Sequence, residues 1–144
     1  MLEKELIVDK ESEIDMCCAS WLHDVLEDCP QIKEEEIVDA VGSRVLSLIK
    51  ELTNPSKGVK APRAVRKQMD RDHLLTVRKE AKIIKLADRI CNLRDMEKAP
   101  EDFIVLYIAE SRALLEVLRN TNKTLEDQLE SIIKSYESRY AKSV

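Results

Sequence analysis

Apolar residues recur at the spacing of an α-helix in one segment after another along this chain. The clearest case is residues 78–94, where five apolar residues follow the helical period: Ala81, Ile84, Leu86, Ile90 and Leu93. No segment longer than a few residues alternates with the period of a strand. The 144 residues include only two glycines and four prolines, and so few turn formers favour helices. We therefore expect an all-α fold.

The length fits one domain with a single core, so we treat residues 1–144 as one helical domain. Pro30 follows a first helix that begins near Ser12, and the clearest loop is residues 54–58 (NPSKG). The expected helices cover residues 12–28, 34–40, 43–52, 62–77, 78–94, 101–119 and 125–140.

The overall charge argues against a protein that binds nucleic acid in general. The formal net charge is −4, whereas such binding draws its affinity from basic contacts to phosphates. Residues 57–71 are a local exception, with six basic residues against one acidic residue. A nucleic-acid contact there is one interpretation. We favour a solvated loop and helix start that touches substrate phosphates.

Features of membrane or secreted proteins are missing from the sequence. No window approaches eighteen uncharged apolar residues, so we expect no membrane span. The first five residues (MLEKE) lack the basic-then-apolar order of a signal peptide, and we expect a cytoplasmic protein. The four cysteines lack paired zinc-ligand spacing, and we expect buried, reduced thiols at Cys17, Cys18, Cys29 and Cys91.

One helical segment carries ionisable groups beside apolar positions. His23 and Glu27 lie one helical turn apart, as do Asp24 and Asp28, so they form two adjacent polar rows. Imidazole nitrogen and carboxylate oxygen suit Mn, Fe, Zn or Mg. A metal held there would polarise a phosphoryl oxygen and lower the pKa of bound water. The alternative is a histidine at the edge of the core beside a solvated acidic face.

A second segment places another acid in a similar setting. Asp88 and Asn92 share a helix face, with Lys85 three residues before Asp88. Leu86, Ala87 and Ile90 should be inside the core, and a buried unpaired aspartate is costly, which favours a functional role for Asp88. The alternative is a salt bridge from Asp88 to Lys85 or to its neighbour Arg89.

These two segments resemble the signatures of one family. Residues 19–28 (ASWLHDVLED) are similar to the A-x-L-L-H-D-x-x-E-D signature of the HD-domain metal-dependent phosphohydrolases. Residues 85–94 (KLADRICNLR) resemble their K-L-A-D-R-x-x-N-L-R signature, which points to the RelA/SpoT-type guanosine polyphosphate hydrolases. The resemblance covers about residues 15–96, and residues 97–144 match only as C-terminal helices. It implies an HD-type bundle of six or seven helices.

The resemblance also implies roles for individual residues. His23, Asp24 and Asp88 would bind a divalent metal, Mn²⁺ in this branch. Glu27 and Asp28 would activate water for attack on a 3′-pyrophosphate of a nucleotide. In this resemblance three further residues would bind or support the substrate: Lys85, Arg89 and Asn92.

The family's first metal ligand is a histidine on an earlier helix, and residues 1–22 contain no histidine. The other histidine, His73, lies where the family has no ligand, and we expect a surface or edge residue near Asp70 and Asp72. Three protein ligands leave open positions for water, as in catalytic sites. The alternative is a shortened, catalytically impaired protein that serves as a nucleotide-binding or protein-interaction module. In the family, the earlier helix covers an apolar surface. We expect residues 2–8 or a second copy of the chain to cover that surface here, and we favour a homodimer.

Overall fold

The computed structural model of the chain describes residue 19 and residues 32–140. Six α-helices and one short 3-10 helix lie in this part, which contains no strand, so the expected all-α class is confirmed. The chain divides into two compact units. The N-terminal unit is residues 7–84, and the C-terminal unit is residues 1–6 with residues 85–144. The boundary falls inside helix α6 (Lys79–Arg94).

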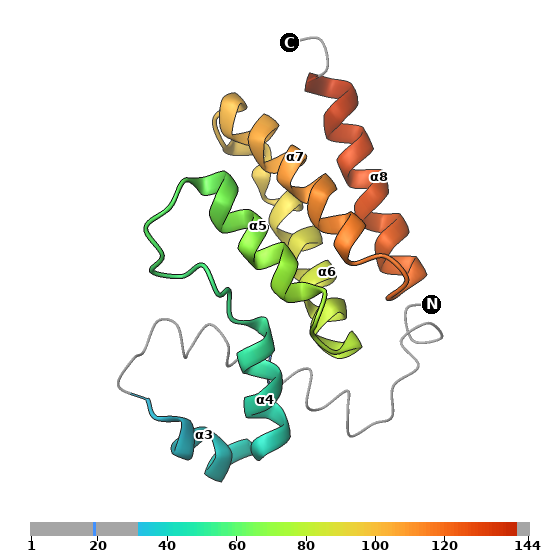
Figure 1. The fold of residues 1–144 in the computed structure, drawn as a ribbon. Coiled ribbons are helices and arrows are strands. Elements are labelled where there is room, and N and C mark those ends of the chain that lie inside the picture. Colours follow the sequence, from blue (N-terminus) through green and yellow to red (C-terminus); the bar gives the residue numbers. More distant parts are fainter. Residues whose placement is uncertain (1–18, 20–31, 141–144) are drawn as a thin grey trace. The chain divides into compact units, whose positions relative to one another are not determined.

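The described part of the N-terminal unit contains α3 (Glu34–Val41), α4 (Ser43–Leu52) and α5 (Arg63–Leu74) (Figure 1). Gly42 joins α3 to α4 with φ +94°, a left-handed conformation that glycine adopts without strain. One face of α4 is buried and supplies five of the buried apolar residues described in this unit, namely Val45, Leu46, Leu48, Ile49 and Leu52.

Glu51 at the end of α4 ties together three segments of the N-terminal unit. Its carboxylate accepts hydrogen bonds from the backbone N–H of Arg78 at 2.8 Å and from Arg78 Nε at 2.9 Å. Its backbone carbonyl accepts a hydrogen bond of 2.9 Å from His73 Nε2. This bond links α5 to α4, and the side chain of His73 is half-buried. It is the edge histidine that we expected, although its partner is Glu51 and not a nearby aspartate.

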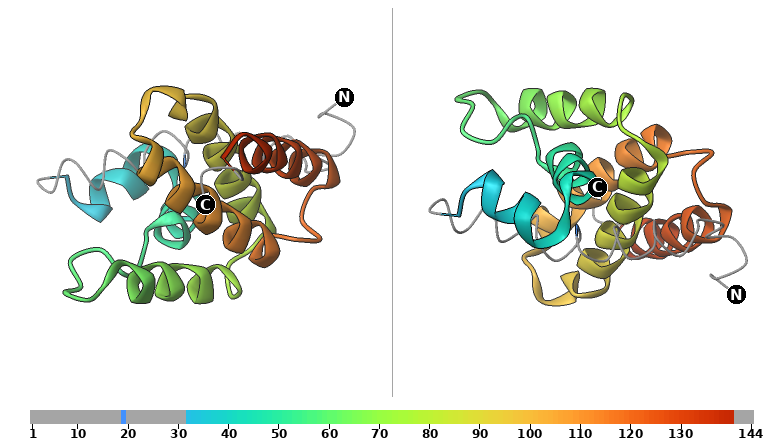
Figure 2. Two further views of the ribbon diagram at one scale, coloured as in Figure 1. Left: turned by 90° about the horizontal axis from the view of Figure 1, so that it is seen from above. Right: turned by 90° about the horizontal axis from the view of Figure 1, so that it is seen from below.

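The C-terminal unit contains the second half of α6, the 3-10 helix η1 (Met96–Lys98), α7 (Glu101–Val117) and α8 (Lys123–Tyr140). Helices α7 and α8 lie side by side and run in opposite directions (Figures 1 and 2). Their fully buried residues include Ile104, Leu115, Leu129 and Ile133. Tyr136 of α8 donates a 2.6 Å hydrogen bond to the carbonyl of Leu93, which fastens α8 to α6.

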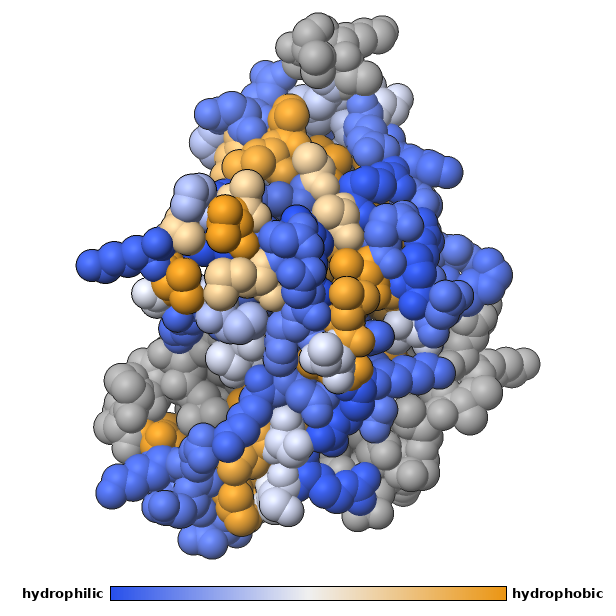
Figure 3. Space-filling view, viewed as in Figure 1, coloured by the Kyte–Doolittle hydropathy of each residue, from blue (hydrophilic) through white to orange (hydrophobic). Residues whose placement is uncertain are grey.

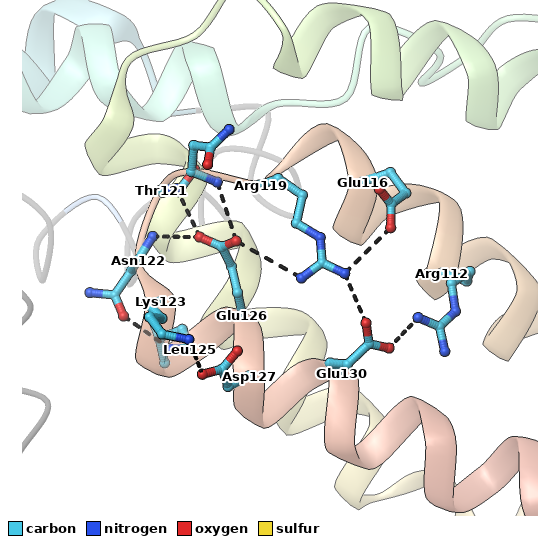
Figure 4. Close-up of polar contacts among 11 residues, drawn as sticks. Arg112, Glu116, Arg119, Thr121, Asn122, Lys123, Leu125, Glu126, Asp127 and Glu130 are labelled. Atoms are coloured by element: carbon cyan, nitrogen blue, oxygen red, sulfur yellow. Dashed lines mark hydrogen bonds and ion pairs between the residues drawn. The ribbon is translucent and has the colours of Figure 1, made fainter.

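Polar contacts also hold α7 and α8 together (Figure 4). Glu130 of α8 accepts hydrogen bonds from Arg119, at 2.8 Å, and from Arg112 of α7. The bond from Arg119 is the main reason why the pKa of Glu130 lies below its ordinary value. At the start of α8, the carboxylate of Glu126 accepts backbone N–H bonds from Thr121 and Asn122 at 2.8 and 2.9 Å. These bonds satisfy donors that the connection from α7 would otherwise leave unpaired.

The expected helices are found with small shifts at their ends. Residues 34–40 and 43–52 correspond to α3 and α4, and the four later segments correspond to α5, α6, α7 and α8. Of the expected helix over residues 12–28, the structure describes only Ala19, which is helical and buried. No described helix is both long enough and apolar enough to span a membrane. The expectation of a buried thiol is wrong for Cys91, which is free and exposed; the other three cysteines lie outside the described residues.

Candidate functional site

Asp88 lies on the exposed surface of α6. The expectation that it is buried is wrong, and Ala87 beside it is exposed too, whereas Leu86 and Ile90 are buried as expected. The helix turns by about 100° per residue, so one apolar stripe can be inside while its immediate neighbours face outward. An exposed carboxylate is hydrated, and it can exchange water for another ligand.

The salt-bridge alternative for Asp88 is not found among the described residues, where no ion pair joins Asp88 to Lys85 or to Arg89. Arg89 contacts α7 instead. Its Nη1 donates a 3.0 Å hydrogen bond to Ser111 Oγ, and its guanidinium carbon lies 4.3 Å from the centre of the Tyr107 ring. A guanidinium at this distance from a ring face makes a favourable cation–π contact.

Asn92 lies one turn after Asp88 and also contacts α7. Its Nδ2 donates a 3.3 Å hydrogen bond to the hydroxyl of Tyr107. Tyr107 in turn stacks on Phe103, with ring centres 5.8 Å apart and planes inclined by 22°. Tyr107 therefore contacts both Arg89 and Asn92. Arg89 follows Asp88 in sequence, and Asn92 lies on the same helix face as Asp88.

Sequence reasoning missed Tyr107 and Ser111. A tyrosine and a serine four residues apart on a mostly apolar helix share a face, and this is the one local signal that singles them out. The sequence did not indicate that this face packs against the polar side of α6.

Large apolar side chains are exposed along α7 near these residues. Phe103, Val105 and Leu106 are each between 37% and 43% exposed. Figure 3 shows apolar side chains gathered over the region of α7. The surface beside the aromatic stack is thus apolar, in contrast to the charged and polar residues at Asp88, Arg89 and Asn92.

Lys85, the remaining predicted site residue of α6, is half-buried, whereas four predicted site residues lie outside the described residues. These are His23, Asp24, Glu27 and Asp28. Within the described part of the chain, no three His, Cys, Asp or Glu residues come together as a metal site. Asp88 is the one predicted metal ligand that the structure describes, and its exposed oxygens suit a hard divalent cation in donor type.

Comparison with known proteins identifies the family. A family model described as the HD domain matches residues 4–123, which is most of the chain. The chain belongs to the HD-domain family. The match extends beyond the two motif segments and includes α7, so the helices that carry Asp88, Tyr107 and Ser111 belong to the domain.

Several relatives carry the name guanosine-3′,5′-bis(diphosphate) 3′-pyrophosphohydrolase MESH1. The chain is 27% identical to the protein from Danio rerio over 126 residues, which cover 84% of this chain and 68% of that protein. It is 32% identical to the one from Xenopus tropicalis over 117 residues, covering 78% and 63%. For the Homo sapiens protein the identity is 29% over 121 residues, covering 81% and 65%. The chain thus spans about two thirds of the length of these relatives.

Proposed function

We propose that this HD-domain protein is a metal-dependent phosphohydrolase that removes the 3′-pyrophosphate from a guanosine polyphosphate. The observation that carries the proposal is the exposed Asp88 carboxylate, unpaired among the described residues, on a helix that also presents Arg89 and Asn92. The names of the relatives support this choice of substrate.

In the proposed site, His23, Asp24 and Asp88 hold a divalent metal ion. Such an ion, when bound, stabilises negative charge on a phosphoryl oxygen and lowers the pKa of water. Imidazole and carboxylate donors suit Mn, Fe, Zn or Mg, and manganese is our specific choice because the resemblance to this branch of the family implies it. The three-ligand set leaves positions for water and substrate.

The chain's own residues perform the remaining steps. Glu27 or Asp28 accepts a proton from the attacking water, as a general base does. The water oxygen forms a bond to phosphorus, the bond from phosphorus to the 3′-oxygen breaks, and that oxygen takes up a proton. Pyrophosphate and a nucleotide with a free 3′-hydroxyl are the products.

Lys85, Arg89 and Asn92 bind the phosphates and the sugar. The contacts of Arg89 and Asn92 with Tyr107 support this role, because side chains held in place before binding lose less freedom when the substrate arrives. We further propose that the basic residues of 57–71 touch substrate phosphates.

Pyrophosphate release tests this proposal. Purified protein supplied with Mn²⁺ is expected to release pyrophosphate from guanosine-3′,5′-bis(diphosphate). Asp88→Ala should reduce the rate at least about a hundredfold, since loss of a residue that only orients a metal ligand already costs about 10- to 100-fold. Asp127→Ala is the matched control. It removes an exposed aspartate of the same unit whose partner is Lys123, and it should leave the rate unchanged. Full activity of Asp88→Ala would contradict the mechanism.

The alternative is a catalytically impaired protein that binds nucleotides or another protein. Elemental analysis separates the two proposals. Protein that contains no metal and shows no thermal shift with millimolar Mn²⁺ would support the alternative, and stoichiometric metal with turnover would exclude it.

A further inference from the structure

A buried hydroxyl on α7 contacts a charged side chain of the proposed site. Ser111 is 0% exposed, and its Oγ accepts the 3.0 Å hydrogen bond from Arg89. The same hydroxyl donates a 2.7 Å hydrogen bond to the carbonyl of Tyr107, one turn earlier on α7. Serine in a helix often donates to the carbonyl four residues before it. A bond from a guanidinium on a neighbouring helix is not part of that local pattern.

The backbone of α7 sets the orientation of the Ser111 hydroxyl. A hydroxyl has one proton and two lone pairs, and the proton of Ser111 is directed at the carbonyl of Tyr107. Its lone pairs therefore remain as acceptors for Arg89. Because Ser111 is completely buried, water does not compete for this position.

One turn of α7 contacts Arg89 in two ways among the described residues. Ser111 accepts a hydrogen bond from Nη1 at the edge of the guanidinium, and the ring of Tyr107 lies against its face. Phe103 stacks on the ring of Tyr107 and supports it. An edge contact together with a face contact limits both the position and the rotation of the guanidinium plane.

We propose that Ser111 is a positioning residue that fixes the guanidinium of Arg89, the residue that follows Asp88 in sequence, so that the positive charge is already in place when an anionic nucleotide binds. This inference rests on the proposed function, because it assigns Arg89 to the substrate's phosphates. Preorganisation of a charged group improves binding of the substrate without a change in the chemical step.

Arginine side-chain NMR measures the positioning directly and needs no activity. In the wild type, rotation about the Cζ–Nε bond of Arg89 is expected to be slow, with separate Nη signals that Arg89→Lys removes. In Ser111→Ala, loss of a hydrogen bond to a charged group should make this rotation roughly tenfold faster. Ser111→Cys preserves the side-chain shape but is a weak acceptor, so it should act like Ser111→Ala and exclude a cavity effect.

Tyr136→Phe is the matched control. It also deletes a buried hydroxyl bound to α6, at the Leu93 carbonyl, but that hydroxyl has no contact with Arg89. It should lower the melting temperature and leave the rotation of Arg89 as in the wild type. Unchanged rotation in both Ser111 variants would overturn the inference.

Steady-state kinetics then tests the consequence. Ser111→Ala should raise KM for guanosine-3′,5′-bis(diphosphate) roughly tenfold with kcat within about twofold of the wild type. Tyr136→Phe should change neither constant. If Arg89 becomes mobile while KM stays constant, the role toward the substrate is wrong. A wild type that hydrolyses no nucleotide contradicts the proposed function, whereas the NMR result still decides whether Ser111 positions Arg89.

Discussion

Single side chains in this protein connect segments that are far apart in sequence. Glu51 is a clear case, because one residue accepts two hydrogen bonds from Arg78 through its carboxylate and one from His73 through its carbonyl. Arg78 also donates to Ser47 at 2.6 Å, one turn before Glu51 on α4. These bonds place the start of α6 against the end of α4 within the N-terminal unit.

Replacement of Glu51 should therefore destabilise the protein. Glu51→Ala leaves the backbone N–H of Arg78 and its guanidinium without their acceptor, and we expect a loss of about 1–2 kcal/mol in the free energy of unfolding, measured by urea denaturation. Lys50→Ala is the control. It removes the ion pair with Glu34, in which both side chains are more than half exposed. The free energy of unfolding should change by about 0.5 kcal/mol or less. Equal effects of the two substitutions would refute this assignment.

At the scale of helices, the sequence predicted most elements well because their signals are local. The expected bounds of α4 are the observed ones. Gly42 marks its beginning, and the polar residues after Leu52 mark its end. Ends that depend on contacts were less accurate. Helix α8 begins at Lys123 and not at 125, because Asn122 Oδ1 accepts the N–H of Leu125 and Glu126 accepts the N–H of Asn122.

The pairing of α7 with α8 should depend on pH through Glu130. Its two arginine partners lower its pKa in the folded state, so the unfolded chain binds the proton more tightly. The stabilisation is therefore complete above the unfolded pKa of glutamate, near 4.3, and is lost as the pH falls through the lower folded pKa.

Urea denaturation of Glu130→Gln between neutral and acidic pH measures this contribution. The variant should be less stable than the wild type at neutral pH, and the difference should narrow as the pH falls below about 4. Lys123→Gln, which removes the lysine of an exposed pair with Asp127 at the start of α8, should show little such narrowing. A constant difference across the pH range would contradict a role for the ionised carboxylate.

At the scale of the whole molecule, the exposed apolar residues of α7 bear on self-association, which we predicted from the sequence. Leu106 is 43% exposed and lies on a helix whose first half is apolar on almost every side. Exposed apolar residues in a cluster are typical of protein interaction surfaces.

We expect the wild type to sediment as a dimer at micromolar concentration and Leu106→Glu to shift it toward the monomer, as analytical ultracentrifugation measures. Val65→Glu is a control at Val65 of α5, which is 50% exposed, and it should leave the dimer intact. A wild type that remains monomeric at all concentrations would exclude the homodimer.

The sequence by itself determined the helices, the all-α class and the family, since helical period and the two motif segments are properties of short stretches of chain. The tertiary structure decided the setting of Asp88. The apolar run around it predicted burial, yet burial depends on which neighbours cover each face of α6, and Asp88 is exposed. It also decided that Tyr107 and Ser111 hold Asn92 and Arg89, because contacts between α6 and α7 arise from packing and leave no mark in either segment alone.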